Sequence, residues 1–152
     1  MTFANRKAID EAEIRELIED RAKAVRAKDI DGSVFNYAPD IVSFDVVNDL
    51  QKIGLDACRN RAEKWFSSFN GPIGYEIRDL SITAGEDVAF SHSLNRVKGT
   101  KTDGGDLEMW WRATVCYRKL GGKWIVTHEH SSVPFDVNTG KASLDLKPKN
   151  AA

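Results

Sequence analysis

The sequence contains very little cysteine. Cys58 and Cys116 are the only two among its 152 residues, and they stand far apart rather than as a Cys-x-x-Cys pair. Two isolated thiols exclude a disulfide framework and give no indication of a thiolate zinc site. We therefore expect both cysteines to be reduced and packed.

Long apolar runs and one-sided charge are also missing. No stretch approaches the roughly 20 apolar residues of a membrane-spanning helix, and the opening sequence MTFANRKAID lacks the apolar centre of a signal peptide. The 22 basic and 23 acidic residues nearly cancel, leaving a formal net charge of -1. Because no basic cluster is combined with aromatic residues, nucleic-acid and membrane partners are not expected. The sequence indicates a soluble protein of the cytoplasm.

The length of the chain fits one compact domain with a sizeable core. We expect this domain to span residues 1–152, with its core over residues 6–135 and a polar tail over residues 136–152. No internal repeat interrupts it.

Helical periodicity is concentrated in the first half of the chain. Between Arg6 and Lys28 apolar residues recur every three or four positions, which is typical of an amphipathic helix. The segment from Leu55 to Phe69 has the same pattern and ends where Asn-Gly-Pro follows. A short helical turn is expected between the two helices, near residues 33–36.

Strand signals occupy the rest of the chain. Apolar β-branched and aromatic residues predict a first strand over residues 41–47, followed by a short second strand over residues 50–54. Beyond the second long helix the apolar period changes to two, which predicts four consecutive antiparallel strands. These strands cover residues 75–83, 88–98, 107–120 and 123–133.

Helices followed by an antiparallel meander predict an α+β fold. The helices are expected to pack on the concave face of a curved, mostly antiparallel sheet, with a cavity between the two layers. The other sheet face would remain open and available to a second copy of the chain, as a homodimer.

Two of the three histidines lie in the closing segment KWIVTHEHSS, residues 123–132. Strict alternation along a strand places His128, His130 and Ser132 on one face and Glu129 on the other. Paired imidazoles beside a hydroxyl group suit proton transfer or oxyanion binding. In the alternative interpretation the pair merely ends a strand, with one imidazole bonded to backbone and the other to solvent. Glu129 is expected to be a surface or interface charge, although a bulge at Gly121-Gly122 would reverse which face of the strand lines the pocket.

The third histidine, His92, lies on a neighbouring predicted strand. His-x-His on a strand is a zinc-ligand spacing, so three converging imidazoles would suit a metal-dependent hydratase. We nevertheless expect no metal and no cofactor, because no side chains that would orient the imidazoles can be identified. His92 and His128 are predicted instead to bind a ligand, together with Ser132.

A buried arginine and an aspartate in an apolar strand are the remaining candidates. Arg112 lies in the largely apolar sequence WWRATVCYR, and Asp45 interrupts the first strand. A buried arginine needs an anion, which is either Asp45 in a closed ion pair or an anionic ligand. A carboxylate held in an apolar cavity can also act as a general base. We predict Asp45, His130 and Arg112 as catalytic residues and Thr114 and Trp65 as ligand-binding residues, although Trp65 also suits a core position.

The order of elements and two motifs resemble the nuclear-transport-factor-two-like superfamily. This is the cone-shaped fold of ketosteroid isomerase, scytalone dehydratase and the SnoaL-like polyketide cyclases. The motif YAPDIVSFD resembles the segment that leads into the first strand of ketosteroid isomerases, in which an aspartate at the place of Asp45 is the base. The motif GGKWIVTHEHSSVPFD is similar to the closing strand of SnoaL-like ketosteroid isomerase homologues and of the calcium/calmodulin-dependent kinase association domain.

The resemblance implies a dimer through the convex sheet face and a pocket on the concave side. It implies a cofactor-independent isomerase, cyclase or dehydratase that acts by proton transfer on a small carbonyl or carboxyl compound. Steroid isomerisation itself is not implied, because the first helix has no tyrosine to serve as oxyanion donor, and the matching strand offers Arg112 or Thr114 instead. The alternative is a non-catalytic ligand-binding or oligomerisation domain.

Overall fold

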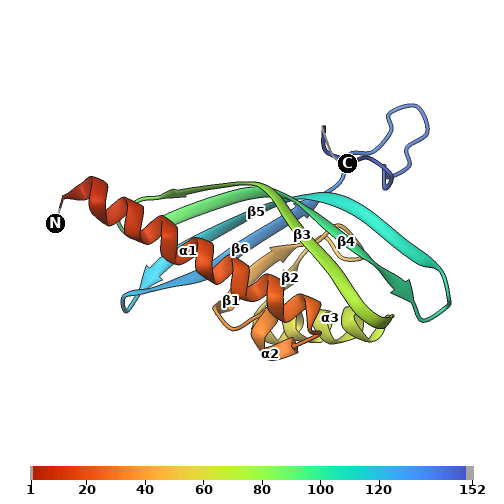
Figure 1. Cartoon of the computed structure of the whole chain (residues 1–152), viewed down its shortest axis with the longest axis horizontal. Helices are drawn as coiled ribbons and strands as arrows, with labels where there is room; N and C mark the ends of the chain where they lie inside the picture. Colours follow the sequence, from red (N-terminus) through yellow and green to blue (C-terminus); the bar gives the residue numbers. More distant parts are fainter. Residues whose placement is uncertain (1, 150–152) are drawn as a thin grey trace.

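The helices of the chain lie along one face of a curved, six-stranded sheet (Figure 1). The structure is a computed structural model that describes residues 2–149. The helices are α1 (Phe3–Arg26), α2 (Ile30–Ser33) and α3 (Leu55–Ser67). The strands are β1 (Tyr37–Phe44), β2 (Lys52–Ile53), β3 (Phe69–Ala84), β4 (Val88–Lys101), β5 (Asp106–Leu120) and β6 (Lys123–Ser132).

The sheet has the strand order β2-β1-β6-β5-β4-β3. All neighbouring strands are antiparallel except β1 and β6, which are parallel. The closing strand therefore lies between the first strand and the meander. The predicted α+β architecture, with helices on the concave face of a mostly antiparallel sheet, is confirmed.

Local sequence explains where the helices begin. Thr2 accepts a hydrogen bond from the backbone N–H of Asn5 at 3.2 Å and so caps α1. Asp29 caps α2 in the same way through the N–H of Gly32 at 3.0 Å. Along α1, the buried residues Ile14 and Val25 belong to the two apolar clusters of the core. Burial of this apolar stripe holds the helix on the sheet.

Irregularities in several strands shape the sheet. Asp79 has a positive φ of 56°, and the pairing of β3 with β4 shifts between Arg78 and Ser81. Such a bulge bends a strand and raises its twist, which curves the sheet around the helices. In β1 a second shift between Tyr37 and Val42 accommodates Pro39, which cannot donate a ladder hydrogen bond.

The chain leaves the sheet after β6 and forms a separate C-terminal loop (Figure 1). This loop is closed by an isolated bridge between Phe135 and Ala142. Within residues 2–149, no helix has both the length and the apolar character needed to span a bilayer.

Candidate active site

A cavity of about 830 Å³ lies between the helices and the inner face of the sheet. Its floor contains short side chains, since Ser93, Ala113 and Ser131 are paired directly across β4, β5 and β6. Small residues at these central positions leave the space that larger core residues would fill. The volume lies within the range of about 300–1,000 Å³ that is usual for small-molecule sites.

Glu129 is the centre of the polar part of the cavity. Its side chain is buried, with 8% exposure of the residue. Oε1 accepts hydrogen bonds from Arg61 Nη2 at 2.6 Å and Ser43 Oγ at 2.9 Å, and Oε2 accepts one from the hydroxyl of Tyr37 at 2.5 Å. The guanidinium of Arg21 lies 3.6 Å from Oε2. Both carboxylate oxygens are therefore occupied.

This environment keeps Glu129 ionised. Burial alone would raise the pKa of its carboxyl group, but Arg21, Arg61 and the hydrogen bonds from Tyr37 and Arg61 outweigh burial and lower that pKa. Burial would also lower the pKa values of both arginines, yet the facing negative charge raises them. Glu129 thus stabilises the site as a fixed anion and is poorly suited to accept a proton from a substrate.

Asp45 is the second carboxylate of the cavity and is less tightly held. Its Oδ1 accepts the backbone N–H of Val46 at 2.7 Å, whereas Oδ2 lies 3.6 Å from Arg61 Nη1, beyond hydrogen-bond distance. The side chain is 27% exposed and lines the cavity. Within residues 2–149, Asp45 Oδ2 accepts no hydrogen bond and is available to a bound molecule.

A β-bulge in β6 corrects the prediction for the closing segment. Cys116 of β5 pairs with His128, but the next residue, Tyr117, pairs with Val126, so Thr127 is an extra residue. One extra residue reverses the alternation beyond it. Glu129 consequently faces the cavity, while His128 and His130 face away from it. The expectation that Glu129 is a surface or interface charge was wrong.

The predicted histidine wall of the pocket is not formed. His92, Thr114 and His130 are directly paired across β4, β5 and β6, on the outer face of the sheet. His92 and His130 are exposed and do not line the cavity. His128 Nδ1 lies 2.6 Å from the carbonyl oxygen of Val42. The alternative interpretation, with one imidazole on backbone and the other in solvent, describes this pair.

Arg112 is also outside the cavity. It is exposed, and its Nε donates to Ser132 Oγ at 3.1 Å on the outer face. The suggested pair of Arg112 with Asp45 does not occur, because Arg61 from α3 takes that place. Of the predicted site residues, Asp45, Thr114 and Trp65 belong to the cavity lining. Thr114 stands between the inward-facing Ala113 and Val115, but it is exposed and pairs with His92 and His130, so its side chain lies on the outer face.

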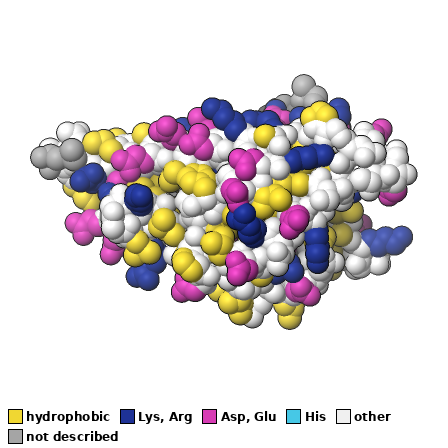
Figure 2. Space-filling model, turned by 90° about the horizontal axis from the view of Figure 1, so that it is seen from below, with side chains coloured by type: hydrophobic (Ala, Val, Ile, Leu, Met, Phe, Trp, Pro, Cys, Tyr) yellow, Lys and Arg dark blue, Asp and Glu magenta, His cyan; other side chains and the backbone are white. Residues whose placement is uncertain are grey.

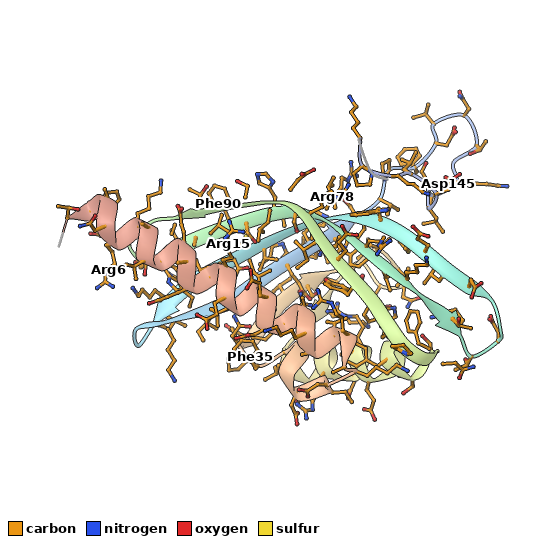
Figure 3. The ribbon with its side chains drawn as sticks, in the orientation of Figure 1. Arg6, Arg15, Phe35, Arg78, Phe90 and Asp145 are labelled. Carbon is orange, nitrogen blue, oxygen red and sulfur yellow. The ribbon has the colours of Figure 1, made fainter. Side chains whose placement is uncertain are left out.

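Two views of the molecule agree with this division between the cavity side and the outer face of the sheet. Figure 2 shows the face at the bottom of Figure 1, where basic and acidic side chains are interspersed among hydrophobic ones and no histidine of the described chain is visible. In Figure 3, Arg78 and Phe90 lie along the upper side of the ribbon, and Phe35 lies on the opposite side near α2 and α3.

The sequence analysis missed both arginines of the cavity. Arg21 and Arg61 each stand three residues after an apolar position of their helix, Ile18 and Cys58, and line the cavity with them. A charged residue on the apolar face of a helix is uncommon and indicates a buried partner or a functional site. That signal was present in the sequence.

No metal centre is built from the described residues. Within residues 2–149, no group of three or more His, Cys, Asp and Glu side chains is placed to hold an ion. The imidazoles of His92 and His130 are separated by the whole width of β5, so the convergence that a metal-dependent hydratase requires does not occur.

Comparison with known proteins identifies the family. A family model described as the SnoaL-like domain matches residues 14–136, and the chain belongs to this family. A search of curated proteins gave no match. An NTF2-like protein of unknown function from Pseudomonas putida KT2440 is 43% identical, with a TM-score of 0.85, over 93% of this chain and 98% of that chain. The resemblance to the nuclear-transport-factor-two-like superfamily is confirmed.

More distant structures share the fold. A ketosteroid isomerase-like protein from Erwinia carotovora atroseptica is 20% identical, with a TM-score of 0.69, over 81% of this chain and 95% of that chain. The association domain of the Caenorhabditis elegans calcium/calmodulin-dependent kinase II is 14% identical, with a TM-score of 0.65, over 84% of this chain and 98% of that chain. At these identities the likeness concerns the fold alone.

Proposed function

We propose that the cavity binds a small organic carbonyl compound and that Asp45 transfers a proton on it without a cofactor. The observation that carries this proposal is the free Oδ2 of Asp45. Asp45 lines the cavity, and its Oδ2 lies 3.6 Å from Arg61 Nη1. Membership of the SnoaL-like family and the fold shared with an isomerase-like protein support an isomerase, cyclase or dehydratase.

The proposed chemistry begins with abstraction of a proton next to the carbonyl group. The C–H bond breaks, the proton moves to Asp45 Oδ2, and the electron pair forms a C=C bond as negative charge develops on the carbonyl oxygen. Return of the same proton to another carbon gives an isomer. Arg61 keeps the Asp45 carboxylate in place, since the same guanidinium is bonded to Glu129.

The first test is a binding and exchange experiment. A thermal-shift screen of enolisable ketones and small carboxylic acids identifies compounds that bind the native state, because such binding raises the melting temperature. Deuterium incorporation next to the carbonyl of each binding compound is then followed by NMR in D₂O. We expect Asp45→Asn to bind the compounds as the wild type does but to exchange at least about 100-fold more slowly, as removal of a general base does. Unchanged exchange in Asp45→Asn contradicts the proposal.

A non-catalytic role is the second candidate. It is favoured by the shared fold with a kinase association domain and by the fully occupied carboxylate of Glu129. A binding or oligomerisation domain of this kind would give thermal shifts without exchange in the wild type. The same two measurements therefore separate the candidates.

We further propose that two copies of the chain form a homodimer through the outer face of the sheet. We also propose that the protein is located in the cytoplasm. The outer face carries aromatic side chains, among them Phe44, which contacts the rings of His128 and His130, and Phe90, which is 49% exposed. Aromatic residues are enriched at protein interfaces. Both cysteines are free thiols, which agrees with a reducing compartment.

A further inference from the structure

A chain of hydrogen bonds crosses the floor of the cavity from β4 to β3. Ser93 Oγ donates to Asn95 Oδ1 at 2.7 Å, and Asn95 Nδ2 donates to the hydroxyl oxygen of Tyr75 at 3.1 Å. Asn95 and Tyr75 are 5% and 8% exposed, and all three residues line the cavity. The chain therefore ends on a phenol that borders the ligand space.

The hydrogen of the Tyr75 hydroxyl is not used. A tyrosine hydroxyl has one hydrogen to donate, and its oxygen can accept in addition. The oxygen of Tyr75 accepts from Asn95, but within residues 2–149 its hydrogen has no acceptor. A buried donor without an acceptor is unfavourable. A ligand that places an acceptor atom beside the Tyr75 hydroxyl is therefore stabilised by the hydrogen bond that forms.

The other two tyrosines of the cavity differ from Tyr75. Tyr37 donates its hydrogen to Glu129 at 2.5 Å, and the hydroxyl of Tyr117 pairs with Ser91 at 3.3 Å. In the bond between Tyr117 and Ser91 either hydroxyl can donate, whereas in the bond between Tyr75 and Asn95 the amide nitrogen must donate. Tyr75 is therefore the tyrosine whose hydrogen the geometry leaves free for a ligand.

The more deeply buried charges that line the cavity compensate one another. The two arginines, Arg21 and Arg61, face two carboxylates, Glu129 and Asp45. Of the other charged residues of the lining, Lys52 pairs with Asp49 at 3.0 Å, and Lys64 is exposed to solvent. The cavity therefore needs no charged ligand to balance it, and a neutral acceptor oxygen suits the free phenol.

The apolar part of the cavity lies beside Tyr75. The rings of Tyr75 and Trp111 are 5.8 Å apart between centroids. Apolar and aromatic side chains that pack in one core cluster with Tyr75 line this part of the cavity, namely Trp65, Ile77, Val97, Leu107, Met109 and Trp111. A flat apolar body fits between such side chains.

We propose that Tyr75 is the donor that recognises the carbonyl oxygen of an uncharged ring ketone, whose apolar body packs against Trp111 and Met109. This inference rests on the proposed function and adds a specificity-determining residue and a ligand class to it. Burial raises the pKa of Tyr75, so the phenol remains protonated at neutral pH. The donors behind it, Asn95 and Ser93, polarise the phenol and strengthen its hydrogen bond.

The test compares a ketone with the hydrocarbon of the same shape. The probes are 2-tetralone and tetralin, titrated into wild type, Tyr75→Phe and Tyr117→Phe, the last being a matched control for loss of a buried phenol. We expect Tyr75→Phe to bind 2-tetralone roughly tenfold more weakly, as loss of one hydrogen bond predicts, and to bind tetralin unchanged. Tyr117→Phe should bind both probes as the wild type does.

A second readout uses the wild type alone. The carbonyl stretching frequency of bound 2-tetralone should lie below its value in hexane, because a donated hydrogen bond weakens the C=O bond. A frequency equal to the hexane value overturns the inference even if Tyr75→Phe does not fold.

The remaining outcomes are also decisive. Equal affinity of wild type and Tyr75→Phe for 2-tetralone, or equal weakening of both probes, overturns the role of Tyr75 and leaves the proposed function standing. Failure of the wild type to bind either probe overturns the ligand class. Failure of the whole thermal-shift screen removes the small-molecule site itself, and with it the proposed function.

Discussion

At the scale of single residues, the polar character of the cavity depends on one buried carboxylate. Glu129 binds side chains from α1, β1 and α3 through Arg21, Tyr37, Ser43 and Arg61. It therefore joins elements that are far apart in sequence. Sequence alone identified Asp45 by its position in an apolar strand, but not Glu129, because its orientation depends on a bulge that side-chain periodicity does not reveal.

Replacement of Glu129 by Gln should destabilise the protein strongly. Two arginines would lose their anion in a buried setting, so we expect the free energy of unfolding to fall by about 3 kcal/mol. Urea denaturation measures this change. The control is Glu108→Gln on the outer face, where the carboxylate lies 3.8 Å from Arg96 and its side chain is 37% exposed. This control should cost less than about 1 kcal/mol, and an equal cost in both variants contradicts the account.

The same residue predicts a dependence of stability on pH. The pKa of Glu129 is lowered in the folded state, so its contribution is present above the unfolded-state pKa of about 4.3 and is lost as pH falls through the folded-state value. The wild type should lose stability on acidification below about pH 4.3, whereas Glu129→Gln should lose less. Parallel curves of unfolding free energy against pH would show that Glu129 is not ionised in the folded state.

At the scale of elements, β6 decides which side chains reach the cavity. The two long helices were predicted within three residues at each end, because their apolar periods are long and regular. Strand β3, by contrast, begins at Phe69 rather than at the predicted Tyr75. Thr127 could not be recognised as a bulge, because no glycine or other turn residue marks it. The parallel pairing of β1 with β6 was likewise not apparent, since it joins distant segments.

Deletion of Thr127 should therefore damage the fold. Without the extra residue, alternation would direct His128 and His130 inward and remove Glu129 from its arginines. We expect a fall in melting temperature of roughly 10 °C or more, or loss of folding, because the cost combines a buried ion pair with misplaced side chains. Deletion of Asp103 in the exposed turn between β4 and β5 is the control and should be tolerated. Similar effects of the two deletions contradict the role of the bulge.

At the scale of the whole molecule, the two faces of the sheet carry different kinds of side chain. The inner face encloses the cavity, and the outer face carries the histidines and several aromatic residues. The family resemblance predicted a cavity on the inner face and a dimer interface on the outer face. The sequence analysis, however, assigned the histidines to the cavity. In the structure they lie on the face that we propose as the dimer interface.

A charge placed on the outer face should prevent dimer formation. Phe90→Asp introduces a carboxylate on the outer face, where Phe90 is 49% exposed, and size-exclusion chromatography with light scattering should then give the monomer mass of 17.0 kDa. Phe35→Asp is a matched control, since Phe35 is 50% exposed and lies on the opposite side of the molecule (Figure 3). A wild type that is monomeric, or a monomer produced only by Phe35→Asp, contradicts the proposed interface.

The central claim is that the cavity, and not the outer row of histidines, is the functional site. Its most direct test is deuterium exchange next to the carbonyl of a cavity-binding ketone, measured in parallel for the wild type, Asp45→Asn and His130→Asn. The account predicts that Asp45→Asn loses at least about 100-fold in rate and that His130→Asn keeps the wild-type rate. Loss of exchange in His130→Asn with full exchange in Asp45→Asn would contradict it.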